Sequence, residues 1–158
     1  MERITFPESF KIVEAIPNQT AAAGADGDYV SLKNAVRAWI VVNLTQGNAA
    51  TVALTVEKAT AVAGTGSVAI TTAVPIWSNL DTAASDTLVR RTDAVAYTTD
   101  AGVKNKQVIF QIDPRTLGEG FTCICVKAGA SNAANILGAQ YILQTTYPSA
   151  TPPAAITD

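Results

Sequence analysis

The middle of the chain alternates between apolar and polar or small side chains with a period of two, as β-strands do. In residues 36–44, every second side chain from Ala38 to Leu44 is apolar, and Trp39 and Val41 occupy the opposite face. A strand that is apolar on both faces is expected in the middle of a sandwich or at an interface. This segment is therefore predicted to be a central strand whose second face also meets a neighbour.

Similar alternation predicts several more strands. They cover residues 51–57, 68–72, 108–112, 121–127 and 140–146, with short candidates at 88–90 and 95–97. The strands at 36–44, 51–57 and 68–72 follow one another closely, and we expect them to form an antiparallel meander. Asp113-Pro114 ends the strand at 108–112, because proline cannot donate to a ladder, and a single helical or 3₁₀ turn is expected after it.

The stretch from Pro75 to Asp100 has a weaker pattern. Ile76 and Trp77 are its only pair of large apolar residues, and we interpret them as an anchor from a long connection into the core. Residues 81–86 could begin a helical turn, since Asp and Ser are favoured N-caps, but an ordered loop is the preferred interpretation.

These elements predict an all-β fold: an antiparallel β-sandwich or jelly-roll-like domain with extended N- and C-terminal segments. Residues 1–28 are small, polar and turn-rich, and are predicted to form a separate N-terminal segment or arm. Residues 29–146 would form the sandwich. Residues 147–158 carry three prolines and are predicted to be an extended tail outside the sheets.

Composition narrows the function classes. The 158 residues include no histidine, which removes the commonest general base and the usual zinc ligand. The formal net charge is -2 and charged residues make up 15%, so nucleic acid and anionic membranes are not expected as partners. The chain starts without a recognisable signal peptide, and no run of apolar residues is long enough for a membrane helix. We expect a structural or binding protein rather than an enzyme.

The two cysteines, Cys123 and Cys125, lie two residues apart on a predicted strand, so their thiols should point the same way. Such neighbours do not form an unstrained disulfide, and two thiolates alone do not complete a metal site. We interpret them as buried free cysteines. Asp26-Gly27-Asp28 superficially suggests a calcium loop but lacks the later acidic ligands. No catalytic, cofactor-binding or metal site is predicted.

Several segments carry a resemblance to known proteins. They are residues 29–35 (YVSLKNA), 47–54 (GNAATVAL), 59–66 (ATAVAGTG), 77–88 (WSNLDTAASDTL), 121–124 (FTCI) and 139–143 (AQYIL). Together they resemble small tailed-bacteriophage virion proteins, and within these the capsid decoration (cement) proteins. The resemblance covers roughly residues 29–158 and is carried by structural rather than catalytic motifs.

The resemblance implies a virion structural protein on the capsid exterior, made in the host cytoplasm. Its partners would be the major capsid protein and copies of itself, in trimers for comparable systems, and it would reinforce the assembled head. Two alternatives remain open at this point: a head–tail or tail component, and a glycan-binding host-adhesion module. The glycan alternative needs exposed aromatic residues, for which the sequence offers Trp39, Trp77, Tyr29, Tyr97, Tyr141 and Tyr147.

Candidate assembly contacts come from two parts of the chain. Trp39 lies on the second apolar face of its strand, and exposed apolar patches usually mark interfaces. The tail keeps large or conformationally restricted side chains that a purely solvated terminus would not need. The predicted contact residues are Trp39, Tyr147, Pro148, Pro152, Pro153 and Ile156.

Overall fold

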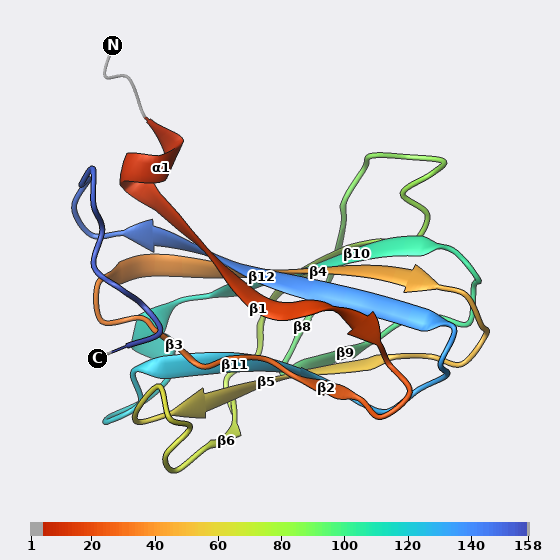
Figure 1. Ribbon diagram of the computed structural model, residues 1–158, viewed down its shortest axis with the longest axis horizontal. Coiled ribbons are helices and arrows are strands. Elements are labelled where there is room, and N and C mark those ends of the chain that lie inside the picture. Colours follow the sequence, from red (N-terminus) through yellow and green to blue (C-terminus); the bar gives the residue numbers. More distant parts are fainter. Residues whose placement is uncertain (1–4, 158) are drawn as a thin grey trace.

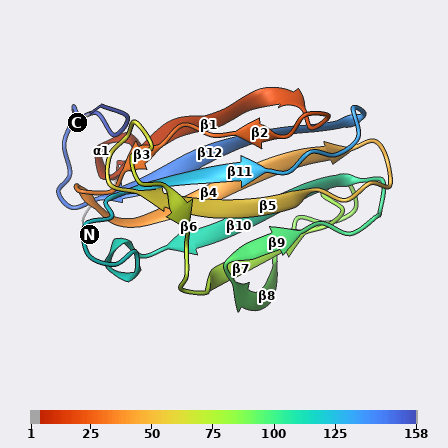
Figure 2. The same ribbon diagram turned by 90° about the horizontal axis from the view of Figure 1, so that it is seen from below.

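A computed structural model describes residues 5–157 and contains two antiparallel six-stranded sheets packed face to face (Figures 1 and 2). Sheet A has the order β1 (Phe10–Thr20), β12 (Asn135–Thr145), β4 (Ala35–Gln46), β10 (Asn105–Ile112), β7 (Val74–Asn79) and β8 (Val89–Ala94). Sheet B runs β2 (Ala25–Asp26), β11 (Cys123–Ala128), β5 (Ala53–Ala59) and β6 (Val68–Ala69); β3 (Val30–Ser31) also pairs with β11, and β9 (Ala96–Thr98) with β5. The predicted all-β sandwich is confirmed.

The core lies between the sheets and follows the predicted alternation. On β4, the side chains of Ala38, Ile40 and Val42 are almost completely buried, whereas Trp39 and Val41 are half-buried on the outside of sheet A. β10 repeats the pattern, and its inward row faces the inward row of β5 and β11. The largest buried side chains of this core include Tyr141, Phe110, Ile40, Leu54, Ile76, Ile112, Ile124 and Leu137.

The predicted meander is confirmed for its second pair of strands, since β6 pairs antiparallel with β5, but it is wrong for the first pair. β4 belongs to sheet A, where it pairs with β12 and β10, whereas β5 belongs to sheet B and pairs with β11. The connection after Gln46 therefore crosses from one sheet to the other. At Gly47 the backbone approaches Ala134 so closely that a Cβ there would lie 2.5 Å from the Ala134 carbonyl oxygen. Residue 47 is glycine because a side chain at this crossing would clash with the backbone of Ala134.

Two further predictions need correction. Residues 74–79, interpreted as part of a long connection, form strand β7, which pairs with β10 and β8. Residues 10–20, placed in a separate N-terminal segment, form β1, which pairs with β12 along its length and buries Ala15 and Ile16. The sandwich therefore begins near Phe10 rather than at residue 29.

Short helices occupy positions outside the sheets. α1 (Phe6–Ser9) precedes β1, and the 3₁₀ helix η1 (Pro114–Thr116) follows β10, as predicted. Residues 81–86 form a loop, also as predicted. None of the helices in residues 5–157 has the length and hydrophobicity required to cross a membrane.

Candidate functional site

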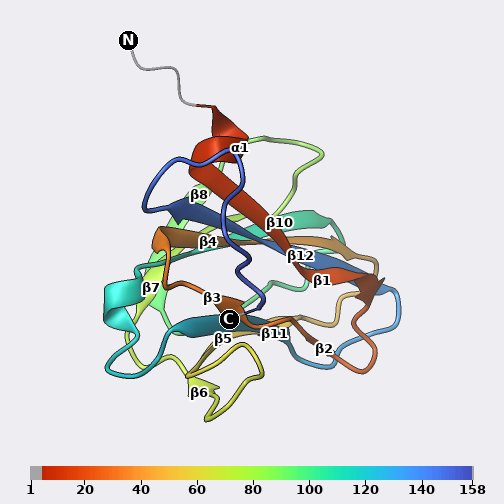
Figure 3. The ribbon, with the colours of Figure 1, turned by 60° about the vertical axis from the view of Figure 1, so that its left-hand side comes forward.

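The first and last segments that the structure describes lie at one end of the sandwich, which we call the terminal end. α1 and the tail (residues 147–157) lie there together, beside the start of β4 and the end of β12 (Figures 1 and 3). In Figure 3 the last part of the tail lies next to β3, where Ala155 is hydrogen-bonded to Ser31. The tail residues that were predicted as assembly contacts therefore all lie at the terminal end.

The tail contains no strand or helix, as predicted, but it folds back onto its own subunit. The Ser149 N–H donates to the Glu8 carbonyl at 2.9 Å, and the Ser31 N–H donates to the Ala155 carbonyl at 2.5 Å. Ala155 is 7% exposed and belongs to the hydrophobic core. The expectation that the whole tail lies apart from the core is therefore wrong at Ala155, because this small side chain packs in the hydrophobic core.

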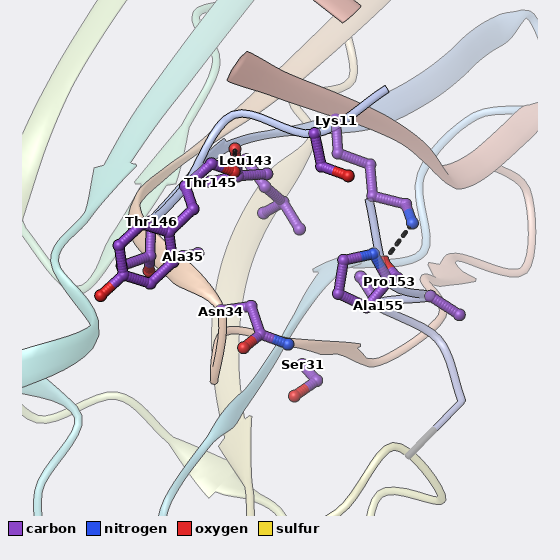
Figure 4. A pocket seen from close by; sticks show the side chains of 12 residues that line it. Lys11, Ser31, Asn34, Ala35, Leu143, Thr145, Thr146, Pro153 and Ala155 are labelled. Atoms are coloured by element: carbon purple, nitrogen blue, oxygen red, sulfur yellow. Dashed lines mark hydrogen bonds between the residues drawn. The ribbon is translucent and has the colours of Figure 1, made fainter. Parts of the chain in front are cut away.

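A pocket of about 150 Å³ remains beneath the tail (Figure 4). Leu143 and Ala35 give it an apolar wall, and Ser31 and Asn34 add polar groups. The ammonium group of Lys11 lies at its rim and donates to the Pro153 carbonyl at 2.5 Å. The tail thus covers the pocket without filling it.

An aromatic cluster extends from the tail over the outside of sheet A. The Phe6 and Phe10 rings stack with centroids 4.9 Å apart, and the Phe10 and Trp39 centroids are 6.2 Å apart. Phe6, Phe10 and Ile12 also line a shallow groove with Pro152 of the tail. We call the surface formed by Phe6, Phe10, Ile12, Trp39 and Pro152 the terminal surface.

The terminal surface joins some of the predicted contact residues. Trp39 and Pro152, which are far apart in the sequence, meet through Phe10 and Ile12. Pro153 lines the pocket instead, and Pro148 lies exposed in the tail. Tyr147 and Ile156 project into solvent, with exposed fractions of 79% and 50%.

Sequence reasoning missed Phe6, Phe10, Ile12 and Lys11. The apolar and β-branched residues Phe10, Ile12 and Val13 near the start of β1 would have been a usable signal for a strand. Two bulges and Pro17 interrupt the two-residue alternation of β1, so the sequence pattern did not predict a strand there.

The opposite end of the sandwich is closed by side chains, and we call it the network end. Lys106 points into the core, with its side chain fully buried, and its ammonium donates to Gln46 Oε1 at 2.8 Å and to Asp100 Oδ1 at 2.5 Å. Thr99 Oγ1 donates to the same Gln46 oxygen at 3.0 Å. The ammonium holds the pKa of the half-exposed Asp100 carboxyl below its ordinary value.

Asn135 completes this end and is fully buried. Its side-chain amide donates to the Ala50 carbonyl at 2.8 Å and its oxygen accepts from the Asn48 N–H at 2.9 Å. These bonds tie the loop after β4 to the start of β12. Each buried polar group here has a partner, as a well-formed interior requires.

Both cysteines are buried and are not joined in a disulfide, as predicted. The Cys125 thiol donates to the Gly27 carbonyl at 3.0 Å, and burial raises its pKa to about 11. A thiol with this pKa is a poor nucleophile and a poor metal ligand at neutral pH. Among residues 5–157, no group of three or more histidine, cysteine or acidic residues is arranged to hold a metal ion.

The aromatic residues considered for glycan binding are mostly engaged. Tyr141 is buried, and its hydroxyl donates to the Asp28 carbonyl at 2.8 Å while accepting from the Val126 N–H at 3.0 Å. The Arg90 guanidinium lies 4.7 Å from the centre of the Trp77 ring and covers that face. Tyr29 donates to Glu57 Oε2 at 2.7 Å.

Comparison with solved structures gives a similarity in fold, whereas comparison of the sequence gives no match. The sequence matches no protein-family model and no curated protein. The fold is similar to a crystal structure of the SPBc2 prophage-derived protein YomS, with a TM-score of 0.48 and 8% sequence identity. The similarity covers 90% of this chain and 98% of YomS. The function of this chain therefore has to be inferred from its own residues.

Proposed function

We propose that the protein is a non-enzymatic virion structural protein, a decoration subunit that associates with copies of itself and binds the outside of an assembled phage head. The observation that carries self-association is the terminal surface, where aromatic and aliphatic side chains from both ends of the chain lie side by side. Phe6 and Ile12 are 46% and 54% exposed there. Exposed apolar groups that are contiguous usually mark an interaction site.

The edges of sheet A support the use of this surface, because they are poorly suited to pairing with another strand. β8, at one edge of sheet A, is short, carries Arg90, Arg91 and Asp93, and is bulged against β7. β1, at the other edge, is bulged twice and contains Pro17. Charges, bulges and proline on edge strands discourage strand addition. Association is therefore expected through faces and termini.

The binding of a phage head rests on the sequence resemblance to decoration proteins and on the sandwich fold. A glycan-binding role has less support, because the Trp77 ring face is occupied by Arg90 and Tyr141 is inside the core. The terminal surface suits a protein partner better. It is apolar, because stacked phenylalanine rings lie there beside proline and isoleucine.

Electron cryo-microscopy of the virions of the phage that encodes this chain would test the proposal. We expect density for the sandwich on the outside of the head, with the terminal surface against a second copy or the shell. Density only at the neck, tail or fibres would overturn the decoration role and leave a virion role. Absence of the protein from purified virions, checked by mass spectrometry, would overturn both.

A further inference from the structure

The tail of this chain forms a loop whose two ends lie close together. Tyr147 and Ala155 line the same pocket of about 150 Å³, so the tail leaves the sandwich and returns almost to its starting point. Eight extended residue steps from Tyr147 to Ala155 span roughly 25 Å at about 3.1 Å per residue in a polyproline conformation. A tail released from these contacts could therefore reach a neighbouring molecule.

The contacts that hold the tail do not depend on its belonging to the same subunit. Two of them use main-chain carbonyls of the tail, at Pro153 and Ala155, and a third uses the Ser149 N–H. The side-chain anchor is the small Ala155. An identical tail from a second copy would make the same bonds to Lys11 and Ser31, so exchange costs little contact energy.

The beginning of the tail has the properties of a hinge. Tyr147 and Pro148 are exposed, and no strand or helix includes them. Proline limits the conformations of an opened segment, so less entropy is lost when it docks on a neighbour. The tail also starts beside the terminal surface, where Pro152 lines a groove with Phe10 and Ile12.

We propose that copies of this protein exchange tails: residues 150–157 of one copy cover the pocket of the next, and Ala155 of the first pairs with Ser31 of the second. This deepens the proposed self-association and rests on it. Exchange would convert the weak attachment of two exposed apolar surfaces into a linked assembly. After exchange the walls of the pocket come from two subunits, because Pro153, Ala154 and Ala155 of the incoming tail line it together with Ser31 and Leu143 of the receiving copy.

Complementary cysteine variants test the exchange directly. In a Cys123→Ala/Cys125→Ser background, one chain carries Ser31→Cys and a second, with a different mass tag, carries Ala155→Cys. The two are co-expressed and oxidised. A disulfide between the two tagged chains requires the tail of one to dock on the other, and we expect this mixed species as the main oxidised product.

The double variant, with both cysteines in one chain, is the control for geometry, since it can close within or between subunits. A closed double variant together with unlinked single variants would overturn tail exchange. Wild-type protein gives an independent check that does not depend on substitution. In a mixture of isotope-labelled and unlabelled chains, we expect a filtered nuclear Overhauser effect between Ala155 of one copy and Ser31 of another.

The oligomeric state separates the two proposals. An oligomer that lacks both the mixed disulfide and the intermolecular Overhauser effect would overturn exchange and leave self-association standing. A 16 kDa monomer at tens of micromolar would overturn both.

Discussion

The two ends of this sandwich are closed by different means. At the network end, hydrogen bonds between buried side chains close the sandwich. Lys106 and Thr99 both donate to Gln46, and Asn135 accepts from the loop after β4. At the terminal end, a proline-containing tail lies over an incompletely filled pocket, held by main-chain carbonyls and one alanine. The network end needs specific side chains in place, so we expect it to stabilise the fold. The terminal end keeps exposed apolar groups, so we expect it to serve assembly.

The largest expected effect is at the network end. Lys106→Ala should lower the free energy of unfolding by about 3 kcal/mol, because it removes a fully buried side chain and leaves a cavity. Lys106→Met is the matched control, since it keeps the volume, and the half-exposed Asp100 can then be hydrated. We expect it to cost about 1 kcal/mol or less. Chemical denaturation measures both, and equal losses would show that volume is not what matters here.

Removing the tail should have a smaller effect on stability and a larger one on assembly. Deletion of residues 147–158 removes Ala155 from the hydrophobic core together with its bond to Ser31. We expect a loss of about 1–2 kcal/mol in unfolding free energy, since the entropy regained by the tail offsets part of these contacts. Light scattering should show weaker association.

Truncation after Ala155 is the control for the tail deletion, because it retains every tail contact described above. It should melt at the temperature of the full chain. If both truncations left association unchanged, the tail would have no role in assembly.

The outside of sheet A allows a test with two tryptophans of similar burial. Trp39→Ala should weaken self-association at least tenfold, because Trp39 contacts Phe10 in the terminal surface. Trp77→Ala, on the same face but beside Arg90 at β7, should leave the association constant unchanged. Sedimentation velocity over a concentration series compares them. If the two variants weakened association equally, the interface would not be confined to the terminal surface and would include the outside of sheet A around Trp77.

Acid should lower the stability of the fold through a different carboxyl group at each end of the sandwich. Lys106 lowers the pKa of Asp100, and hydrogen bonds from Arg115 lower the pKa of Asp113 to about 2. Both pKa values are lower in the folded chain than the roughly 3.9 of an unfolded aspartate. Their contributions are therefore complete above about pH 4 and are lost as the pH falls through the folded values.

The corresponding variants separate these contributions. Lys106→Met should make stability less sensitive to pH between about pH 4 and 2 by removing the Asp100 part, and Arg115→Gln should remove the Asp113 part. Urea unfolding at several pH values measures the free energy of unfolding of each variant and hence its dependence on pH. A steeper acid dependence in Lys106→Met than in wild type would contradict the assignment to Asp100.

The cysteines should have the smallest effect. At Cys125 a serine hydroxyl could donate to the Gly27 carbonyl that now accepts from the thiol, so Cys125→Ser should cost about 1 kcal/mol or less. Association should be unchanged. A chelator that lowered the melting temperature of wild-type protein would contradict the structural role of this pair.

The central strands could be predicted because burial and alternation coincide there. From Ala38 to Leu44 every inward side chain is apolar and buried, and the outward row adds Trp39 and Val41, which also favour a strand. β7 could not be predicted, because its inward row includes Ser78, a fully buried residue whose hydroxyl accepts from Arg91 and Tyr97. A polar residue satisfied by distant partners looks like a loop residue in the sequence.

The candidate site was predicted only in part for a related reason. Trp39 and the tail prolines stand out in the sequence, but their junction is made by Phe6 and Phe10 of a segment that bulges disguise. The docking of the tail uses main-chain carbonyls, which every residue possesses, so composition could not reveal it.

Hydrogen exchange measured by mass spectrometry at low and high protein concentration tests most directly which end assembles. The amides of residues 6–12, 31–39 and 147–157 should gain protection as concentration rises, while those of residues 46–52 and 99–106 should not change. Protection gained at the network end, or none at either end across the range, would contradict the assignment of assembly to the terminal end.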